Sequence, residues 1–546
     1  MNILITGSNG QLGNELRVIA QRTPQHTYTF VDVDRLDITD SLAVDRFFAE
    51  GNYAVCINCA AYTAVDKAET DRDLCYRINV TGVEHLANAC QKHHAVFFHI
   101  STDFVFDGTG TQPYRIDHHV QPLSVYGQTK AEGEYRALSL NEKTILIRTS
   151  WVYSTFGANF VKTMIRLGKE RAELGVVDDQ IGCPTYARDL AEVIFAFIPK
   201  LGDVPYGIYH FSNSGITSWA GFAEKIMQLY GLNCRVNRIT TEQYPTAATR
   251  PEYSVLDCSK IIETLHISIP TWESALQDCI QQLKQQEMLQ QINVQDVIAI
   301  AEAAGKEIMH IYATDDFAVT DKSDNSPLTK ADKASNAVIV AALQKQYPQI
   351  PIISEENKLL AYDERKGWDT LWLVDPLDGT KEFIKKNGEF TVNIALIQNG
   401  KPVMGVVGIP ARNHMYYAVE GKGAYKVDEH GNTSKLQIAE PRTDTIALIG
   451  SRSHPSPEFD AYLKDMESKY AQVDFVPAGS SLKFCLVAEG KADVYPRLGP
   501  TMEWDTAAGH AVVLEAGARV KVYGSTDDLS YNKENLLNPF FIVEKA

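Results

Sequence analysis

The sequence predicts two α/β domains in one chain, the first of them built on a doubly wound parallel sheet. The length of 546 residues exceeds what a single hydrophobic core usually supports. The first half alternates strand-like and helix-like segments, the pattern of a parallel sheet covered by helices. That alternation stops in a Gln-rich stretch and then restarts. We therefore predict domains at residues 1–285 and 294–546.

Five β-rich runs mark the sheet of the first half. They are MNILIT (1–6), YTFVDVD (28–34), YAVCINCA (53–60), AVFFHIST (95–102) and KTILIRTS (143–150). Residues 286–293 lie in the Gln-rich stretch, which keeps helical spacing and has no Pro or Gly, so we predict a helical joint there. A disordered linker is the alternative for this stretch.

The second half opens with an amphipathic helix and continues with β-rich segments. The helix is VQDVIAIAEAAGKEIMHIY (294–312), and the segments are LWLVDPLD (371–378), FTVNIALIQ (390–398), PVMGVVGIP (402–410) and MYYAVEG (415–421). A further set of strands and helices fills the last third. No internal repeat links the halves, so we interpret the chain as a fusion of unrelated domains.

Composition narrows the possible functions. Hydrophobic content of 45% and charged content of 22% are ordinary for a globular protein, and no long apolar run predicts a membrane span. The net charge of −17 argues against nucleic-acid binding. The first residues read as a buried strand without a basic leader, so we expect a cytoplasmic protein. Cys56 and Cys59 form a CxxC, for which packed thiols are favoured over zinc or redox chemistry.

A glycine-rich turn follows the first predicted strand directly. It comprises Gly7, Gly10, Gln11, Leu12 and Gly13, and it opens a helix. Glycines there allow a tight turn and close approach to a pyrophosphate, which the helix N-terminus then binds. Its placement directly after the first strand is typical of the phosphate turn of a Rossmann domain, so the pattern predicts a dinucleotide site.

Acidic residues near the second strand extend this prediction. Asp32 ends that strand, where a carboxylate could meet an adenine ribose hydroxyl and favour NADH over NADPH. A solvated strand end is the alternative for Asp32. Asp37 and Ile38, a little further on, are expected beside the adenine.

Tyr126 and Lys130 lie four residues apart in YGQTK, on one face of a predicted helix. A nearby cation favours a phenolate, so we expect the Lys to lower the pKa of the Tyr. Such a Tyr can give a proton to a carbonyl oxygen, and the Lys can also hold a nicotinamide ribose. Thr102 and Asp103, at the end of an apolar strand, add a hydroxyl for a substrate oxygen. A YxxxK pair on a surface helix can also arise by chance.

GSNGQLG, INCAAYTAVDKAE, ISTDFVFDG, YGQTK, RTSWVY, DDQIGCPT and TRPEYSVLD occur in this order. Together they resemble the dTDP-4-dehydrorhamnose reductase family of extended short-chain dehydrogenases, over residues 1–285. The resemblance implies a Rossmann domain with a small substrate subdomain and NAD(P)H-dependent reduction of dTDP-4-dehydro-L-rhamnose to dTDP-L-rhamnose. A related epimerase or dehydratase is the alternative, but Phe104 after Thr-Asp, where dehydratases usually carry an acid, favours simple reduction.

The same resemblance implies roles for individual residues. Tyr126 becomes the proton donor, Lys130 tunes it and binds the cofactor, and Thr102 and Asp103 meet the substrate. Gly10, Gln11 and Leu12 meet the pyrophosphate. Further cofactor contacts are Ala60, Ala61 and Tyr62, and further sugar-nucleotide contacts are Trp151 and Arg250. For Trp151, a core aromatic is the alternative.

Three separated acidic motifs occur in the second half. Asp375 and Asp378 lie in DPLDGT after an apolar strand, Glu355 follows IPIIS, and Asp505 follows Trp504 at a predicted helix start. Carboxylates and a carbonyl such as that of Leu377 are the oxygen ligands that Mg²⁺ prefers. Clustered metals support in-line phosphoryl displacement, so we predict a Mg²⁺-dependent phosphatase. The alternatives are an Asp-Pro turn for the first pair and a helix cap for Asp505.

The combination of EE, DPLDGT and WDTAAG resembles the inositol monophosphatase superfamily, over residues 292–546. The resemblance implies a layered α/β/α/β/α sugar-phosphatase fold and lithium sensitivity. Glu355, Asp375, Leu377, Asp378 and Asp505 become the metal ligands. Thr380 orients the attacking water, and Asp332 supports a weaker metal.

KEFIKKNGEFTVNIALI, SRSH, GSSLKFCLVAEGKADVYPR and GPTMEWDTAAGHAV match the CysQ type of 3'(2'),5'-bisphosphate nucleotidase within that superfamily. This type removes the 3'-phosphate of adenosine 3',5'-bisphosphate, a by-product of sulfate assimilation, and leaves AMP. The implied nucleotide-binding residues are Ser480, Ser481, Lys483 and Arg497, although Lys483 and Arg497 could instead be solvated surface cations. An inositol monophosphatase is the alternative.

The implied partners are small molecules, namely a sugar nucleotide and an adenosine bisphosphate, with no nucleic acid and no membrane. A homodimer is possible. A non-catalytic scaffold is the alternative for either half. It is disfavoured because Tyr126, Lys130, Glu355, Asp375 and the other implied catalytic residues are all present.

Overall fold

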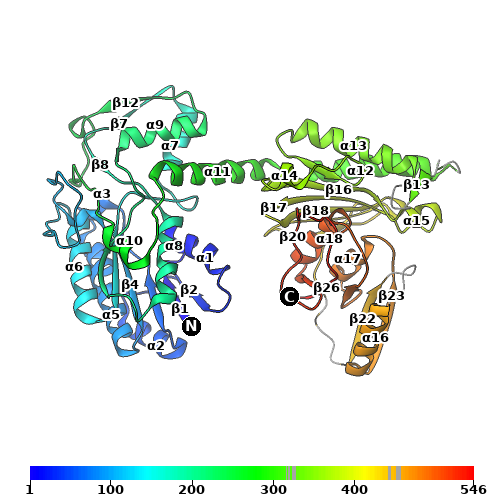
Figure 1. Cartoon of the computed structure of the whole chain (residues 1–546), viewed down its shortest axis with the longest axis horizontal. Coiled ribbons are helices and arrows are strands. Elements are labelled where there is room, and N and C mark those ends of the chain that lie inside the picture. The colour runs from blue at the N-terminus through cyan, green and yellow to red at the C-terminus, as the bar shows by residue number, and fades with distance from the viewer. Residues whose placement is uncertain (315–316, 318–319, 322–326, 439, 441–443, 451–456) are drawn as a thin grey trace. The chain divides into compact units, whose positions relative to one another are not determined.

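The computed structural model describes residues 1–314, 317, 320–321, 327–438, 440, 444–450 and 457–546. The chain divides into two compact units, Met1–Leu289 and Gln290–Ala546, drawn from blue to green and from green to red in Figure 1. The stretch predicted as a joint holds the end of helix α11 (Trp272–Gln291) and Asn293. The Asn293 side chain accepts a hydrogen bond from the Gln295 N–H and so caps α12 (Val294–Tyr312).

The first unit is built on a six-stranded sheet in the order β10-β5-β4-β3-β1-β2, in which every neighbouring pair is parallel. The strands are β1 (Asn2–Thr6), β2 (Thr27–Phe30), β3 (Val55–Asn58), β4 (Val96–Thr102), β5 (Thr144–Thr149) and β10 (Gly207–His210). The five predicted runs all contain strands, and β10 was not predicted.

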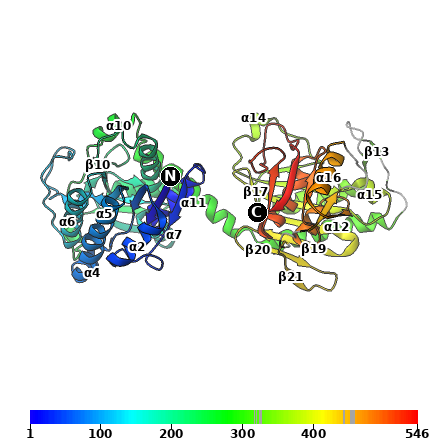
Figure 2. The ribbon, with the colours of Figure 1, turned by 90° about the horizontal axis from the view of Figure 1, so that it is seen from below.

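Helices cover both faces of this sheet. On one face, α1 (Gln11–Ala20) and α8 (Ala187–Phe197) bury the side chains of Ile3 and Ile5. On the other face, α2 (Ser41–Gly51), α5 (Gly82–Lys92) and α6 (Val125–Leu140) cover Leu4. Figure 2 shows α5 and α6 side by side. The doubly wound parallel sheet is therefore confirmed.

A second, smaller core supports the predicted substrate subdomain. It joins α7 (Phe160–Glu170), α9 (Trp219–Tyr230) and the first part of α11 to the parallel pair β7 (Glu173–Val177) and β12 (Arg235–Ile239). All of these elements follow β5 in the chain, so the subdomain is assembled from the later part of the unit.

The second unit is built on a seven-stranded sheet in the order β15-β16-β17-β18-β19-β20-β21. The strands are β15 (Ile352–Ser354), β16 (Thr370–Asp378), β17 (Thr391–Gln398), β18 (Lys401–Ile409), β19 (His414–Val419), β20 (Gly423–Val427) and β21 (Thr433–Lys435). Only β15 and β16 pair in parallel, and the rest form an antiparallel meander.

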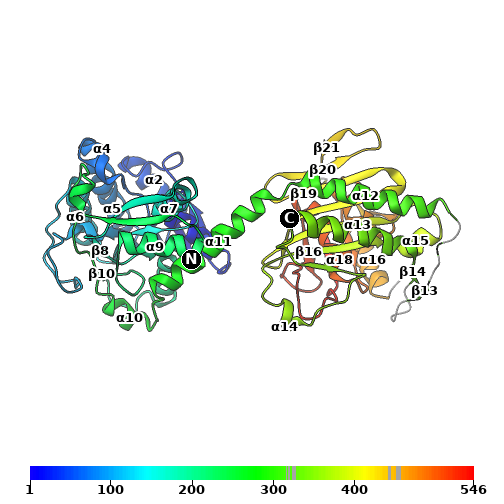
Figure 3. The same ribbon diagram turned by 90° about the horizontal axis from the view of Figure 1, so that it is seen from above.

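Layers of helices and small sheets cover both faces of this sheet. On one face lie α12 and α13 (Lys330–Gln346), side by side in Figure 3. On the other face, α17 (Leu482–Ala488) and α18 (Glu503–Glu515) pack with Leu371 and Leu373. Beyond these helices lie β24 (Tyr495–Arg497), β25 (Ala518–Val522), β26 (Phe541–Lys545), the pair β22 (Thr445–Gly450) and β23 (Gln472–Pro477), and α16 (Pro457–Lys469). This confirms the predicted layered fold.

Two expectations about composition can be compared with the structure. Within the described part of the chain, every helix is too short or too polar to span a lipid bilayer. Cys56 packs into the core on one face of the first sheet, whereas Cys59 packs against the core on the other face. The CxxC therefore does not present two thiols to one metal, because residues three apart on an extended strand point to opposite sides.

Candidate active sites

The glycine-rich turn lies between β1 and α1, against the end of β3. Gly7 has a φ of +63°, and a Cβ atom there would lie 2.5 Å from the backbone nitrogen of Ala60. At Gly13 a Cβ atom would lie 2.5 Å from the Cα atom of Ser8. Only glycine fits both positions, because contacts this short are excluded for any side chain. The turn therefore forms a cradle of bare backbone at the N-terminus of α1.

A cavity of about 420 Å³ opens beside this cradle. Its lining contains seven of the predicted cofactor residues, namely Gly7, Gly10, Asp32, Asp37, Ile38, Ala60 and Ala61. The Asp32 carboxylate accepts hydrogen bonds from the backbone N–H groups of Asn9 at 3.0 Å and of Val33 at 2.8 Å. Asp32 therefore faces the site and is not merely a solvated strand end. A dinucleotide fits this combination of bare backbone and a facing carboxylate.

Five predicted cofactor residues lie outside this lining, and one of them, Lys130, is on α6 (Val125–Leu140). Leu12 is buried in the core beneath α1, and Gly13 contacts the turn itself. The Gln11 side chain accepts a hydrogen bond from Asn159 at 3.0 Å. The Tyr62 hydroxyl donates to Asp71 at 3.1 Å. The lining of the cavity also includes Arg77 and Ile78, which were not predicted. These residues begin a π-helix (Arg77–Thr81), and α-helical periodicity does not reveal a π-helix.

Tyr126 and Lys130 lie on one face of α6, next to the end of β4. The Ser124 side chain caps α6 by accepting the Gly127 N–H at 3.2 Å. The Lys130 ammonium donates to the carbonyl oxygen of Ile100 at 2.7 Å. The Thr102 hydroxyl donates to the Asp103 carboxylate at 2.9 Å and also hydrogen-bonds Tyr126. The structure thus brings the predicted triad of phenol, ammonium and hydroxyl together.

Burial governs the protonation of these groups. It raises the pKa of Tyr126 well above its usual value. It lowers the pKa of Lys130 to about 8, against the opposing effect of Glu134, and raises the pKa of Asp103 to about 6. The expectation that Lys130 lowers the pKa of Tyr126 was therefore wrong, because loss of hydration outweighs any effect of the cation. Asp103 is buried beside Thr102, which suits holding that hydroxyl in place.

A second cavity, of about 470 Å³, lies in the subdomain. Arg250 lines it and forms a bidentate ion pair with Asp66, at 2.7 and 3.1 Å. Trp151 stacks on Trp219 with ring centroids 3.7 Å apart, and it is Trp219 that lines the cavity. Trp219 was not predicted, because its position depends on packing across the subdomain.

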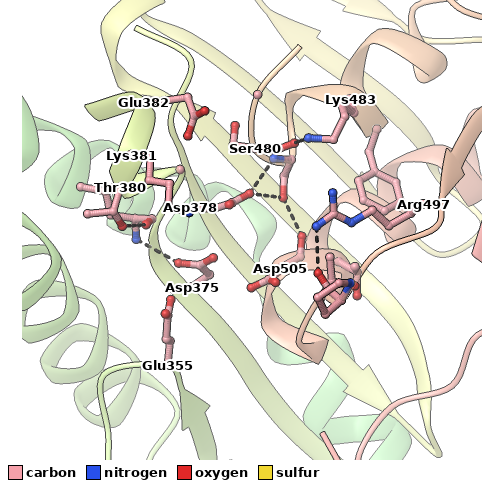
Figure 4. Close-up of a pocket in the computed structure, with 18 of the residues that line it drawn as sticks. Glu355, Asp375, Asp378, Thr380, Lys381, Glu382, Ser480, Lys483, Arg497 and Asp505 are labelled. Carbon is pink, nitrogen blue, oxygen red and sulfur yellow. Dashed lines mark hydrogen bonds between the residues drawn. The ribbon is translucent and has the colours of Figure 1, made fainter. Parts of the chain in front are cut away.

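In the second unit the acidic motifs converge on one cavity of about 410 Å³ (Figure 4). Glu355 follows β15, Asp375 and Asp378 lie at the end of β16, and Asp505 lies in the first turn of α18. The pairing of β16 with β17 is irregular between Asp375 and Asp378, which re-aims the end of the strand. Leu377 and Thr380 also line this cavity.

A network of hydrogen bonds holds these acids in position. The Ser481 N–H donates to Asp378 at 2.6 Å, and the Ser481 hydroxyl lies 2.9 Å from the same carboxylate oxygen. That hydroxyl is also 2.6 Å from the carbonyl oxygen of Asp505, and it accepts a hydrogen bond from Asn393 at 2.9 Å. Asp505 accepts the Met502 N–H at 2.9 Å, so it is a helix cap as well as a cavity residue.

The electrostatics of the cluster fit a cation. Burial and then the charges of Glu355, Asp378 and Asp505 raise the pKa of Asp375 well above its usual range. Burial and then Asp378 raise the pKa of Asp505 to about 8. A divalent cation would relieve this repulsion. Among the described residues, no three His, Cys, Asp or Glu side chains are arranged so that they could hold a metal ion by themselves. Mg²⁺ suits this arrangement, because it keeps several waters and takes few protein ligands directly.

Basic groups line the same cavity, across from the acids (Figure 4). The Lys483 ammonium donates to the carbonyl oxygen of Ser480 at 2.6 Å, and burial lowers its pKa to about 8. Arg497 donates to the carbonyl oxygen of Pro500 at 2.8 Å. Neither is a solvated surface cation. Ser480 lies in the left-handed region with a φ of 44°, at the turn before Ser481.

Comparison with known proteins connects each half to a family. A family model described as the RmlD substrate binding domain matches residues 1–285. That half is 42% identical to a dTDP-4-dehydrorhamnose reductase of Aggregatibacter actinomycetemcomitans over 288 residues, which are 50% of this chain and 97% of that relative. A model of the inositol monophosphatase family matches residues 288–538. That half is 48% identical to the 3'(2'),5'-bisphosphate nucleotidase CysQ of Salmonella typhimurium over 252 residues, 46% of this chain and 98% of the relative.

The chain belongs to both families, one in each half. A crystal structure of a dTDP-4-dehydrorhamnose reductase from Clostridium acetobutylicum matches the RmlD half with 44% identity and a TM-score of 0.50, covering 52% of this chain and all of that one. Both resemblances stated from the motifs are thereby confirmed. Of those motifs, SRSH (451–454) lies outside the described residues.

Hydrogen bonds in the inositol monophosphatase half modify the predicted site in three respects. Ser481 was predicted to bind nucleotide, but its side chain is directed to Asp378 and to the carbonyl oxygen of Asp505. Asn393 was not predicted, because only the fold brings β17 next to Ser481. Thr380, at the start of α15 (Thr380–Ile384), donates to Asp332 in the first turn of α13 at 3.2 Å.

Proposed function

We propose that the RmlD half reduces dTDP-4-dehydro-L-rhamnose to dTDP-L-rhamnose with NADH or NADPH. The observation that carries this proposal is the meeting of Tyr126, Lys130 and Thr102 at the end of β4. The cradle of bare backbone at Gly7 supports a dinucleotide cofactor. The 42% identity to a named reductase over nearly all of its length supports the choice of sugar nucleotide.

In this proposal the side chains of the chain bind, orient and supply a proton. Tyr126 remains protonated at neutral pH because burial raises its pKa, so it can give its proton to the C4 oxygen. The Thr102 hydroxyl is held by Asp103 and would donate to the same oxygen once it turns from that carboxylate to the substrate. Arg250, on the wall of the subdomain cavity, is suited to a diphosphate. When bound, the nicotinamide supplies the hydride to the C4 carbon.

The rate of NADH and NADPH oxidation with dTDP-4-dehydro-L-rhamnose tests this half. Tyr126→Phe should lower kcat by roughly a hundred- to ten-thousandfold, since it removes the proton donor but leaves the cofactor cavity intact. Cofactor binding, measured by fluorescence, should change little. If the variant kept the wild-type rate, Tyr126 would not be the proton donor.

For the second half we propose Mg²⁺-dependent hydrolysis of the 3'-phosphate of adenosine 3',5'-bisphosphate to AMP. The observation that carries this proposal is that one cavity holds both the four acids and the pair Lys483 and Arg497. The acids suit the metal, with Leu377 adding a carbonyl oxygen. The two cations suit the second phosphate that distinguishes a nucleoside bisphosphate from inositol monophosphate.

The residues around the acids have matching roles. Asp375, Glu355, Asp378 and Asp505 would hold the metal, and Thr380 would orient the attacking water. When bound, Mg²⁺ activates water and stabilises the leaving oxygen. Ser480 and Lys483 would contact the nucleotide. We expect lithium inhibition, as in the wider superfamily.

Phosphate release by the purified chain with Mg²⁺ tests this half. Adenosine 3',5'-bisphosphate should be strongly preferred over inositol 1-phosphate, and Asp375→Asn should abolish release while NAD(P)H oxidation continues. Preference for inositol phosphate would instead indicate an inositol monophosphatase and would remove the roles of Lys483 and Arg497. No release from either substrate would favour a non-catalytic scaffold.

We further propose that the reductase comprises residues 1–285 and the nucleotidase residues 294–546, with residues 286–293 as a helical joint. The proposed substrates are cytoplasmic metabolites, so the cytoplasm is the proposed compartment. A homodimer is also proposed, and sedimentation of the purified chain would test it.

A further inference from the structure

Three polar side chains follow one another along a single face of α6. They are Tyr126, Lys130 and Glu134, each separated by one helical turn. The first two belong to the proposed reductase mechanism, and Glu134 does not. Glu134 is nonetheless only 4% exposed. Acidic side chains are rarely buried to this degree unless they are paired, so its partners are informative.

Glu134 is held by two neighbouring strands of the sheet. From β5, Arg148 donates to both carboxylate oxygens, with its Nη2 atom 2.7 Å from Oε2 and its Nε atom 2.9 Å from Oε1. Arg148 is itself 2% exposed. From β4, the Ser101 hydroxyl donates to Oε1 at 2.5 Å. Glu134 thus joins α6 to β4 and β5 beneath the proposed site.

Strand β4 connects Glu134 to the side chains of Lys130 and Tyr126. Ile100, Ser101 and Thr102 are consecutive residues at the end of that strand. Ile100 accepts the Lys130 ammonium, Ser101 is bound by Glu134, and Thr102 hydrogen-bonds Tyr126. A movement of Ser101 would therefore displace both the acceptor of Lys130 and the hydroxyl of Thr102.

We infer that Glu134, paired with Arg148, is a positioning residue of the reductase that fixes the end of β4 and maintains Lys130 as an ammonium group. This inference rests on the proposed reductase function. Glu134 acts through Lys130 and Thr102, and it does not contact the substrate or the cofactor.

The charges around Lys130 support this role. Burial lowers the pKa of Lys130 to about 8, and the negative charge of Glu134 opposes that effect from the same helix. Lys130 also interacts with Cys75 on α4 (Arg72–Tyr76) and with His99 on β4. Tyr126 lies one turn before it on α6, and Arg148 on β5 carries the charge that pairs with Glu134. His99 is neutral, because burial and Lys130 hold its pKa well below the usual value. Glu134 is therefore the carboxylate that favours the charged form of Lys130.

The test compares three variants of the full chain. Glu134→Gln removes the charge but keeps the shape, and Glu134→Asp keeps the charge. Glu132→Gln is the matched control, since Glu132 lies on the same helix and pairs with Arg136 at the surface. For each, kcat/KM for ketone reduction is measured from about pH 6 to about pH 9, a range that spans the pKa of Lys130. Phosphate release from adenosine 3',5'-bisphosphate by the same preparation gives the concentration of intact chain.

We expect the alkaline decline in activity to move to lower pH in Glu134→Gln, because Lys130 then loses its proton more readily. A movement of one pH unit would give a loss of about fivefold near pH 8, rising toward about tenfold at higher pH, with a smaller loss near pH 6. Glu134→Asp should keep the wild-type pH dependence even if its rate is lower. Glu132→Gln should match the wild type in both respects.

Two results would overturn the inference. The pH profile of Glu134→Gln could superimpose on that of the wild type, or Glu134→Asp could shift as far as Glu134→Gln. If Glu134→Gln does not fold, the double variant Glu134→Gln, Arg148→Met removes the buried pair together, a change that proteins often tolerate. An unshifted profile in that variant would overturn the inference equally.

A failure of the proposed function is distinguishable from these results. If the wild-type chain does not reduce the ketone, the reductase proposal is wrong. The pH dependence of NADH binding, followed by fluorescence, then reports on Lys130 without any sugar substrate. Identical pH dependence in the wild type and Glu134→Gln would in that case refute the positioning role.

Discussion

Replacing Ser481 with alanine tests how the nucleotidase site holds its metal. The hydroxyl lies 2.9 Å from an Asp378 carboxylate oxygen and 2.6 Å from the carbonyl oxygen of Asp505, and it accepts a hydrogen bond from Asn393 at 2.9 Å. Alanine removes all three contacts. The backbone N–H of residue 481 would still donate to Asp378, at 2.6 Å in the wild type. The proposed metal ligands would therefore remain but be less well oriented.

The size of the effect follows from these contacts. Loss of one hydrogen bond to a charged group costs about 1.5–3 kcal/mol. Since about 1.4 kcal/mol corresponds to a factor of ten, the affinity for Mg²⁺ should fall roughly ten- to hundredfold. Removal of groups that orient metal ligands in other proteins has effects of about this size. The Asn393 amide, left without its acceptor, would add a smaller cost in stability.

The assay is phosphate release from adenosine 3',5'-bisphosphate as a function of Mg²⁺ concentration, together with direct calorimetric titration of Mg²⁺. In Ser481→Ala the half-saturating Mg²⁺ concentration should rise, and the rate at saturating Mg²⁺ should recover much of its wild-type value. Ser468→Ala is the control, because the Ser468 hydroxyl donates to the carbonyl oxygen of Asp465 within its own surface helix. An unchanged Mg²⁺ dependence in Ser481→Ala would refute the orienting role.

Three further predictions concern the cofactor site and the buried histidines. Asp32→Ala should raise kcat/KM with NADPH relative to NADH, because a 2'-phosphate would no longer meet a carboxylate, and an unchanged ratio would contradict this. Gly7→Ala should destabilise the first unit by about 1–3 kcal/mol in thermal unfolding and should weaken NADH binding. The reason is that the added Cβ atom would lie 2.5 Å from the Ala60 backbone nitrogen. A wild-type melting temperature would show that the turn relaxes freely. Burial lowers the pKa of both His210 and His510 to about 3. The unfolded chain therefore binds protons below about pH 6.5 that the folded chain does not, so stability should fall from about pH 6.5 toward pH 3. His510→Gln should reduce this dependence in urea unfolding of the second unit, and equal slopes for variant and wild type would contradict it.

Periodicity and local motifs were enough to predict most of the main sheet in each unit. The runs from MNILIT to KTILIRTS contain five of the six strands of the first sheet. The sixth strand, β10, is the short segment GIYH. Its local pattern does not indicate a strand, and it is placed in the sheet by pairing with β5. Short strands are stabilised mainly by their neighbours, so their sequences are weakly distinctive.

In the candidate sites too, some residues could be predicted from local sequence, whereas others depend on contacts that only the fold creates. Tyr126 and Lys130 could be predicted because a helix brings residues four apart together, and Asp375 and Asp378 because one turn carries both. The role of Ser481 could not, because it depends on Asp378, 103 residues away in sequence. The pKa of Tyr126 was predicted in the wrong direction for a related reason. A sequence shows that a cation is near, but it does not show how deeply the phenol is buried.

Each proposed site is built from the residues of one unit alone. The cofactor and subdomain cavities are lined by residues between Gly7 and Arg250, and the acidic cavity by residues between Glu355 and Thr506. The chemistry proposed for one half supplies neither substrate nor cofactor to the other. Covalent linkage therefore adds nothing to either set of reacting groups. We therefore expect the fusion to serve joint production of the two activities or a shared assembly.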